Sequence, residues 1–155
     1  LGVKADALED RLTATLALFD IRKENTLAPV ACNPGVAGTC SQQVGAERSK
    51  GVELEVNYSL LENLQFIAGL AYTDAYVDET FNSPTAPLVG SQLTNSALRT
   101  ANLWVRYDVL EGPLQGLGIG FGTYYSSEIA GSLPSLSDRR VLMLPSYTVA
   151  DLALY

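Results

Sequence analysis

Residues 51–60 read Gly-Val-Glu-Leu-Glu-Val-Asn-Tyr-Ser-Leu, and this stretch decides the fold. Its apolar side chains, from Val52 to Leu60, share one parity, while polar side chains such as Glu53 and Glu55 share the other. Successive side chains of a β-strand point to opposite faces, so strict alternation indicates a strand with one apolar and one polar face. The stretch therefore predicts an antiparallel sheet with an apolar surface on one side.

The same alternation recurs along the chain. The predicted strands are residues 12–24, 51–60, 64–77, 100–109, 117–125 and 148–154. A partial strand at residues 1–5 would make a seventh. In residues 12–24 the first half is apolar on both parities, so the sequence leaves open which parity belongs to the apolar side. We therefore expect six to seven strands with clear faces in most of them.

Short and long connections alternate strictly between these strands. The short ones are residues 7–10, 61–63 and 110–116, and the long ones are residues 25–47, 78–98 and 128–146. All seven prolines fall in connections, as expected where every strand N–H joins a ladder. Long loops are unusual in compact soluble domains, whereas outer-membrane barrels have short turns on one rim and long loops on the other. The pattern predicts an all-β, antiparallel up-and-down meander from a transmembrane β-barrel of the bacterial outer membrane.

Composition excludes several classes of function. The 155 residues include 10 basic and 17 acidic side chains, a net charge of −7, which provides no basic patch for nucleic acid. The absence of histidine rules out a histidine-based catalytic triad and a histidine metal site. No run of about 18 apolar residues could form a transmembrane helix. Leu1–Asp10 is too charged for a signal peptide, so we expect an exported protein to begin upstream of it.

Two features resemble catalytic motifs but have simpler explanations. Glu53 and Glu55 lie on one strand face, where a polar wall explains them without acid–base chemistry. Glycines alternate through residues 116–122, but a dinucleotide-binding loop would need a helix after it, and more strand follows. Small inward residues that leave room beside the sheet, or bend it, are the better explanation. The chain is therefore not predicted to be an enzyme or to need a metal or cofactor.

The two cysteines, Cys32 and Cys40, flank a segment that contains Pro34 and Gly35. A disulfide between them would close a small loop and stabilise the fold by very roughly 2–3 kcal/mol. Disulfides persist in oxidising compartments such as the periplasm or the cell surface. We predict this bond, with two unrelated thiols as the alternative.

Three stretches resemble strand motifs of TonB-dependent outer-membrane receptors. They are Leu-Phe-Asp-Ile-Arg-Lys-Glu-Asn at residues 18–25, Arg-Ser-Lys-Gly-Val-Glu-Leu-Glu at residues 48–55, and Leu-Pro-Ser-Tyr-Thr-Val-Ala-Asp at residues 144–151. Their order resembles the C-terminal third of the siderophore-receptor branch. The resemblance implies a barrel of about 22 strands around a plug. Residues 1–155 would be a partial barrel domain, without the plug domain and the closing strands.

The resemblance also implies a function, namely uptake of ferric siderophores or similar nutrients, energised by TonB through the missing plug, in a wall surrounded by outer-membrane lipid. Receptors of this kind commonly meet their ligands with arginine and aromatic side chains. Four weak candidates for substrate contact follow: Arg139 and Arg140 in the third long connection, and Trp104 and Arg106 on the polar parity of their strand. Each is equally well a solvated loop charge or a wall residue facing the plug.

Three alternatives stay open at this point. Arg106 and Asp108 could form an ion pair within the wall and have no contact with substrate. A passive outer-membrane porin would show the same strand pattern. A soluble β-sandwich binding module would also show it, provided that the apolar faces met in a shared core.

Overall fold

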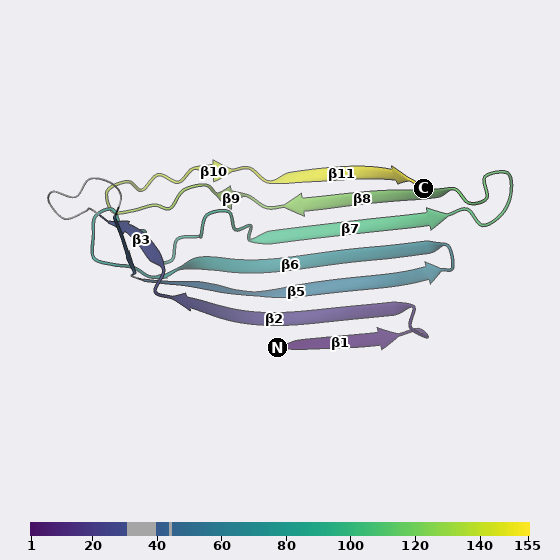
Figure 1. The fold of residues 1–155 in the computed structure, drawn as a ribbon, viewed down its shortest axis with the longest axis horizontal. Helices are drawn as coiled ribbons and strands as arrows, with labels where there is room; N and C mark the ends of the chain where they lie inside the picture. The colour runs from purple at the N-terminus through teal and green to yellow at the C-terminus, as the bar shows by residue number, and fades with distance from the viewer. Residues whose placement is uncertain (31–39, 44) are drawn as a thin grey trace.

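The computed structural model describes residues 1–30, 40–43 and 45–155, and its main feature is one antiparallel sheet of seven strands. Each strand is hydrogen-bonded to the next one in chain order, so the sheet is a meander (Figure 1). The strands are β1 (Gly2–Ala7), β2 (Leu12–Glu24), β5 (Ala46–Leu61), β6 (Leu64–Glu79), β7 (Arg99–Asp108), β8 (Gly118–Ser126) and β11 (Tyr147–Leu154). The predicted meander is confirmed, with β1 as its seventh strand.

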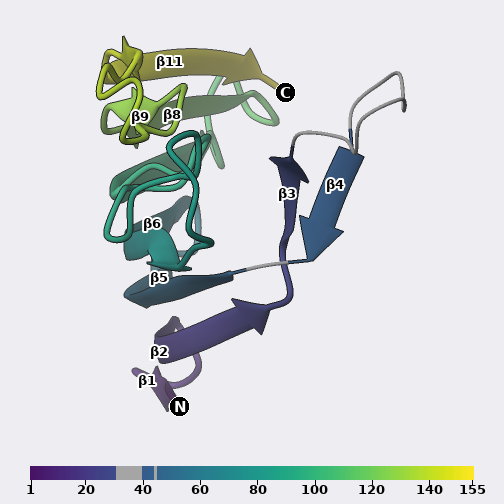
Figure 2. The ribbon, with the colours of Figure 1, turned by 90° about the vertical axis from the view of Figure 1, so that its left-hand side faces the viewer.

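The connections fall at two ends of the sheet. The short turns lie at one end, the turn end, and the long connections lie at the other, the loop end (Figure 1). Two small hairpins form within the long connections: β3 (Leu27–Val30) with β4 (Cys40–Gln43), and β9 (Ile129–Ala130) with β10 (Met143–Leu144). In Figure 2 the β3–β4 pair stands beside the single layer of the main sheet. No helix among the described residues is long and apolar enough to cross a membrane.

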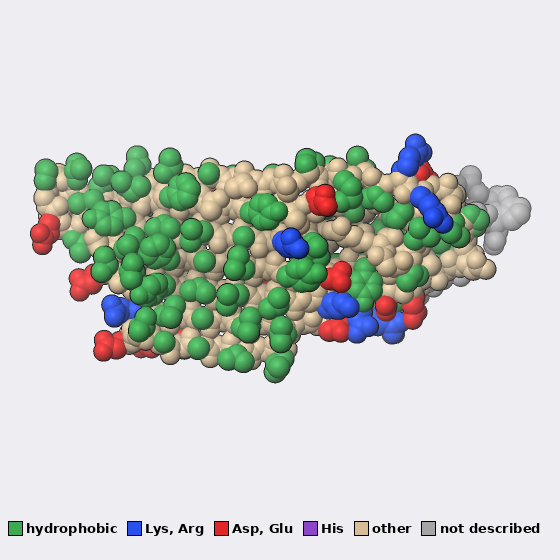
Figure 3. Space-filling model, turned by 180° about the vertical axis from the view of Figure 1, so that it is seen from behind, with side chains coloured by type: hydrophobic (Ala, Val, Ile, Leu, Met, Phe, Trp, Pro, Cys, Tyr) green, Lys and Arg blue, Asp and Glu red, His purple; other side chains and the backbone are tan. Residues whose placement is uncertain are grey.

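The register gives the sheet two distinct faces. One row of paired residues crosses six strands and consists of Leu16, Leu54, Leu70, Ala101, Tyr125 and Thr148. We call the side that carries this row the apolar face, and Figure 3 shows apolar side chains spread over it. The opposite side, which carries Glu53, Glu55 and Asn102, is the polar face. Pairing also settles the faces of β2, because Leu18 is opposite Val52 and therefore belongs to the apolar face.

The apolar face changes character toward the loop end. β5 and β6 have 16 residues each, or roughly 50 Å at the usual rise of a strand, which is longer than a tilted membrane strand requires. Beyond the apolar band, charged side chains occupy the same parity. Arg48 donates two hydrogen bonds of 2.7 Å to the Asp20 carboxylate, and Arg22 bonds Asp78 at 2.8 Å. These pairs mark the end of the apolar band.

Among the residues whose burial is described, the few buried side chains lie at the loop end. The buried apolar residues are Ala46, Ala75, Val77, Ala86 and Ala130. They are buried because the connections after β6 and β8 pack against each other. The Leu88 N–H donates to the Pro134 carbonyl at 2.9 Å, and the Ser137 N–H donates to the Pro84 carbonyl at 2.9 Å. The two long connections therefore form one joined layer at the loop end of the sheet, which we call the loop layer.

One predicted strand boundary needs correction, and one alternative left open by the sequence does not hold. The strand predicted at residues 51–60 begins at Ala46, because its pairing with β6 continues past the apolar band as far as Glu79. A soluble sandwich would bury the apolar face under a second sheet. Within the described residues no second sheet packs there, and Leu70 and Leu152 remain 56% and 80% exposed. The apolar face is thus shaped for an apolar surrounding medium.

Candidate functional site

Trp104 lies flat on the polar face, over two glycines of the neighbouring strand. The register pairs Trp104 with Gly122, and Gly120 is two residues away on the same face. A Cβ atom added at Gly120 would lie 2.5 Å from Trp104 Cζ2, and one at Gly122 would lie 2.6 Å from Cζ3. The alternating glycines therefore leave the space that the indole ring occupies. This gives the predicted small inward residues a specific purpose.

The same arrangement occurs twice more on the polar face. Phe19 is paired with Gly51, where an added Cβ atom would lie 2.8 Å from its ring. Asn102 is paired with Gly69, where an added Cβ atom would lie 2.6 Å from its amide nitrogen. In each case a large side chain lies across the strand at a position that has no side chain of its own. At these three positions the glycine leaves room for its neighbour across the sheet.

Arg106 makes its contacts with other residues of the same sheet. Its guanidinium donates to the Asp108 carboxylate at 2.9 and 3.0 Å, which confirms the predicted ion pair. It also lies 4.5 Å from the centre of the Tyr155 ring, within the range of a cation–π contact. Because β7 runs from Arg99 at the loop end to Asp108 at the turn end, this group lies near the turn end. Its Nε and Nη2 groups are thus bound to a carboxylate within the sheet.

Glu53 and Glu55 are exposed on the polar face and form no ion pair within the described part of the chain. The groups beside them across the sheet are small or neutral: Ala71 is paired with Glu53, and Gly69 with Glu55. No group of His, Cys, Asp or Glu among the described residues could hold a metal ion. The two carboxylates are therefore available to a partner that faces this side of the sheet.

Arg139 and Arg140 lie in the connection between β9 and β10, and both are exposed. Arg140 donates to the Asp138 carboxylate at 2.9 and 3.0 Å, and its side chain is 91% exposed. Through these hydrogen bonds, Arg140 holds the pKa of the Asp138 carboxyl below its usual range, and Asp138 in turn raises the pKa of Arg140. Arg139 has no ion pair among the residues that the structure describes.

The four predicted substrate candidates do not come together. Arg139 and Arg140 lie in the loop layer, whereas Trp104 and Arg106 lie on the polar face toward the turn end. A single ligand at the loop end could meet the first pair only. Cys32 lies outside the described residues, so the Cys32–Cys40 bond stays a prediction.

Sequence reasoning missed Arg99 and the groove beside it on the apolar face. Arg99 lies just outside the strand predicted at residues 100–109, so the prediction did not assign its side chain to either face of the sheet. In the structure β7 begins at Arg99, which shares its face with Ala101. A reading of the alternation one residue further would have found an arginine at the edge of an apolar band.

Together these features indicate the class of protein to which the chain belongs. A curved, single-layer meander with an apolar outer face, a polar inner face, short turns and long loops is a section of the wall of an outer-membrane β-barrel. Residues 1–155 match the family described as TonB dependent receptor-like, beta-barrel. The chain belongs to this family, and it is a protein of the bacterial outer membrane. The apolar face therefore faces lipid and the polar face lines the barrel lumen.

Several known proteins are similar to the chain. It is 36% identical to the metal-pseudopaline receptor CntO of Pseudomonas aeruginosa, covering 97% of this chain and 20% of the receptor. It is 30% identical to the ferrichrome outer membrane transporter/phage receptor of Escherichia coli, covering 97% and 18%. The crystal structure of the siderophore receptor PiuA from Acinetobacter baumannii has a TM-score of 0.71 at 27% identity, covering 97% of this chain and 20% of that one. The chain thus spans about a fifth of these relatives, which are transport receptors.

Proposed function

We propose that this chain is part of the wall of a receptor that imports a ferric siderophore or a similar metal chelate, with energy supplied by TonB. The observation that carries the proposal is that all 155 residues match the barrel of this family. The relatives that cover 97% of the chain are named as receptors or transporters for metal–pseudopaline and ferrichrome. TonB would act through a plug domain in the whole receptor.

The geometry supports separate roles for the two ends of the wall. Arg139 is an exposed cation in the loop layer, suited to an anionic metal chelate arriving from outside. Arg140 would join it if Asp138 released its guanidinium. Trp104 and Arg106 are fixed against the wall and would face the plug. Glu53 and Glu55 offer free carboxylates to basic side chains of the plug.

The test uses the whole receptor gene in a strain that has lost it. Growth on single metal chelates as the metal source is compared with and without the gene, and with and without TonB. We expect growth on at least one chelate to require both. Growth that needs the gene but not TonB would overturn the proposal in favour of a passive channel.

A second arm tests the loop arginines. The double variant Arg139→Gln, Arg140→Gln should raise the chelate concentration needed for half-maximal uptake. The matched control is Arg11→Gln at the turn end, where Arg11 bonds the Leu8 carbonyl at 3.2 Å. Equal uptake by the double variant and the control would remove the loop arginines from the ligand site.

A further inference from the structure

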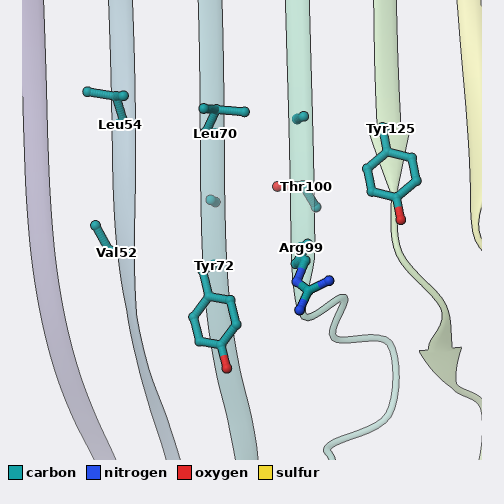
Figure 4. A pocket seen from close by; sticks show the side chains of 9 residues that line it. Val52, Leu54, Leu70, Tyr72, Arg99, Thr100 and Tyr125 are labelled. Atoms are coloured by element: carbon teal, nitrogen blue, oxygen red, sulfur yellow. The ribbon is translucent and has the colours of Figure 1, made fainter.

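A groove of about 360 Å³ crosses β5 to β8 on the apolar face. It exists because Ala101 is short, while its row neighbours Leu70 and Tyr125 are long. Figure 4 shows Leu54 and Leu70 toward one end of the groove and Tyr72 and Arg99 toward the other, with the Tyr125 ring on β8 between these two levels. The hydroxyls of both tyrosines point toward the loop end. The groove is therefore apolar along its length and polar where the apolar band ends.

A second hollow continues the first one toward the loops. It measures about 370 Å³ and shares Arg99 and Tyr125 with the groove. Its remaining lining residues are Gln92, Leu98, Ser127, Glu128 and Ser146. Hydroxyl, amide and carboxylate groups of this kind bind the hydroxyls of a sugar. An apolar groove and a polar recess thus meet at a single arginine.

Arg99 is the available cation at this junction. Arg22 and Arg48, at the loop end of the same face, are both held by carboxylates. Arg99 makes no ion pair within the described ranges, and Glu128 lies in the same recess without bridging to it. Its backbone is fixed, because its N–H donates to Ser127 Oγ at 3.1 Å and its carbonyl accepts from the Ser127 N–H at 2.9 Å. An unpaired guanidinium that extends from a fixed backbone at the membrane boundary suits a phosphate group.

We propose that this groove and recess bind one phosphorylated, acylated glycolipid of the surrounding leaflet. An acyl chain would lie over Ala101 between Leu70 and Tyr125. The phosphate would contact Arg99, and sugar hydroxyls would reach Ser127 and Glu128 in the recess. The site is on the outside of the barrel, so its occupant comes from the membrane and is not the transported chelate.

The test uses the whole receptor, purified in detergent, stripped of lipid, and titrated with purified lipid A. Retained lipid is counted by native mass spectrometry. Arg99→Gln should weaken lipid A binding roughly fivefold, the value of one basic side chain at a membrane surface. Ala101→Leu fills the groove without changing charge and should weaken binding by a similar factor. Arg140 is a cation of the loop layer outside the groove, so Arg140→Gln should leave lipid A binding unchanged.

A zwitterionic probe separates this site from ordinary contact with lipid. Phosphatidylethanolamine should bind more weakly than lipid A to the unaltered receptor, because it carries no sugar for the recess. Equal binding of the two lipids would overturn the proposal, and so would lipid A binding that neither Arg99→Gln nor Ala101→Leu changes. Chelate uptake by both variants should match the unaltered receptor, which shows that each variant folds.

Discussion

Two residues of β7, only three positions apart, use the space beside the strand in opposite ways on the two faces of the sheet. On the polar face, Trp104 covers the positions of Gly120 and Gly122, so a large side chain fills the space left by small ones. On the apolar face, Ala101 is the small residue, and the space between Leu70 and Tyr125 stays open. At these two positions, therefore, the polar face fills the space with its own side chain, whereas the apolar face leaves a groove open to an outside molecule. The surrounding medium explains the open groove on the apolar face, because lipid can fill it.

The largest effect should come from charging one face and not the other. Leu103 and Asn102 are neighbours on β7 that belong to opposite faces. Leu103→Arg places a cation in the middle of the apolar band and should lower the free energy of unfolding by about 2–4 kcal/mol in lipid vesicles. Asn102→Arg points into the lumen and should cost much less. Urea titration of the refolded receptor measures both, and equal costs would contradict our assignment of the faces.

A smaller effect should separate two glycines of the polar face. An added Cβ atom at Gly51 would meet the backbone carbonyl of Tyr72 as well as the Phe19 ring, whereas one at Gly122 would meet mainly the Trp104 indole. Backbone yields less easily than a side chain, so Gly51→Ala should cost about 1–3 kcal/mol and Gly122→Ala less.

The partner side chains provide the control for this comparison. Trp104→Leu should recover stability in the Gly122→Ala background, because the indole is the obstacle there. Phe19→Leu should recover little in the Gly51→Ala background, since the Tyr72 carbonyl remains. Equal recovery in both pairs, measured by the same urea titration, would mean that the two glycines serve the same purpose.

The strands could be predicted from the sequence because the alternation of Val52, Leu54 and Val56 with polar residues is local and strict. The Arg106–Asp108 pair was also within reach, since two residues apart on a strand means the same face. The hydrogen bonds between the two long connections were not, because Leu88 and Pro134 lie in segments with no periodic pattern. The groove could not be predicted from the sequence for another reason. It depends on how Ala101 aligns with Leu70 and Tyr125 across three strands.

The smallest effect concerns Asp138, whose pKa Arg140 holds below its usual range. A carboxyl whose folded pKa is depressed contributes stability that is present above its unfolded pKa and is lost as the pH falls through the folded pKa. Both side chains are exposed, so solvent screens this contribution and the stability of the receptor should barely change. The titration itself should still be visible. In ¹³C NMR of the labelled carboxyl, Arg140→Gln should move the Asp138 pKa back up toward 3.8, whereas Arg139→Gln should leave it lowered. An unchanged pKa in Arg140→Gln would mean that Arg140 is not bound to Asp138 in solution, and would leave both arginines of the loop layer free for an anionic chelate.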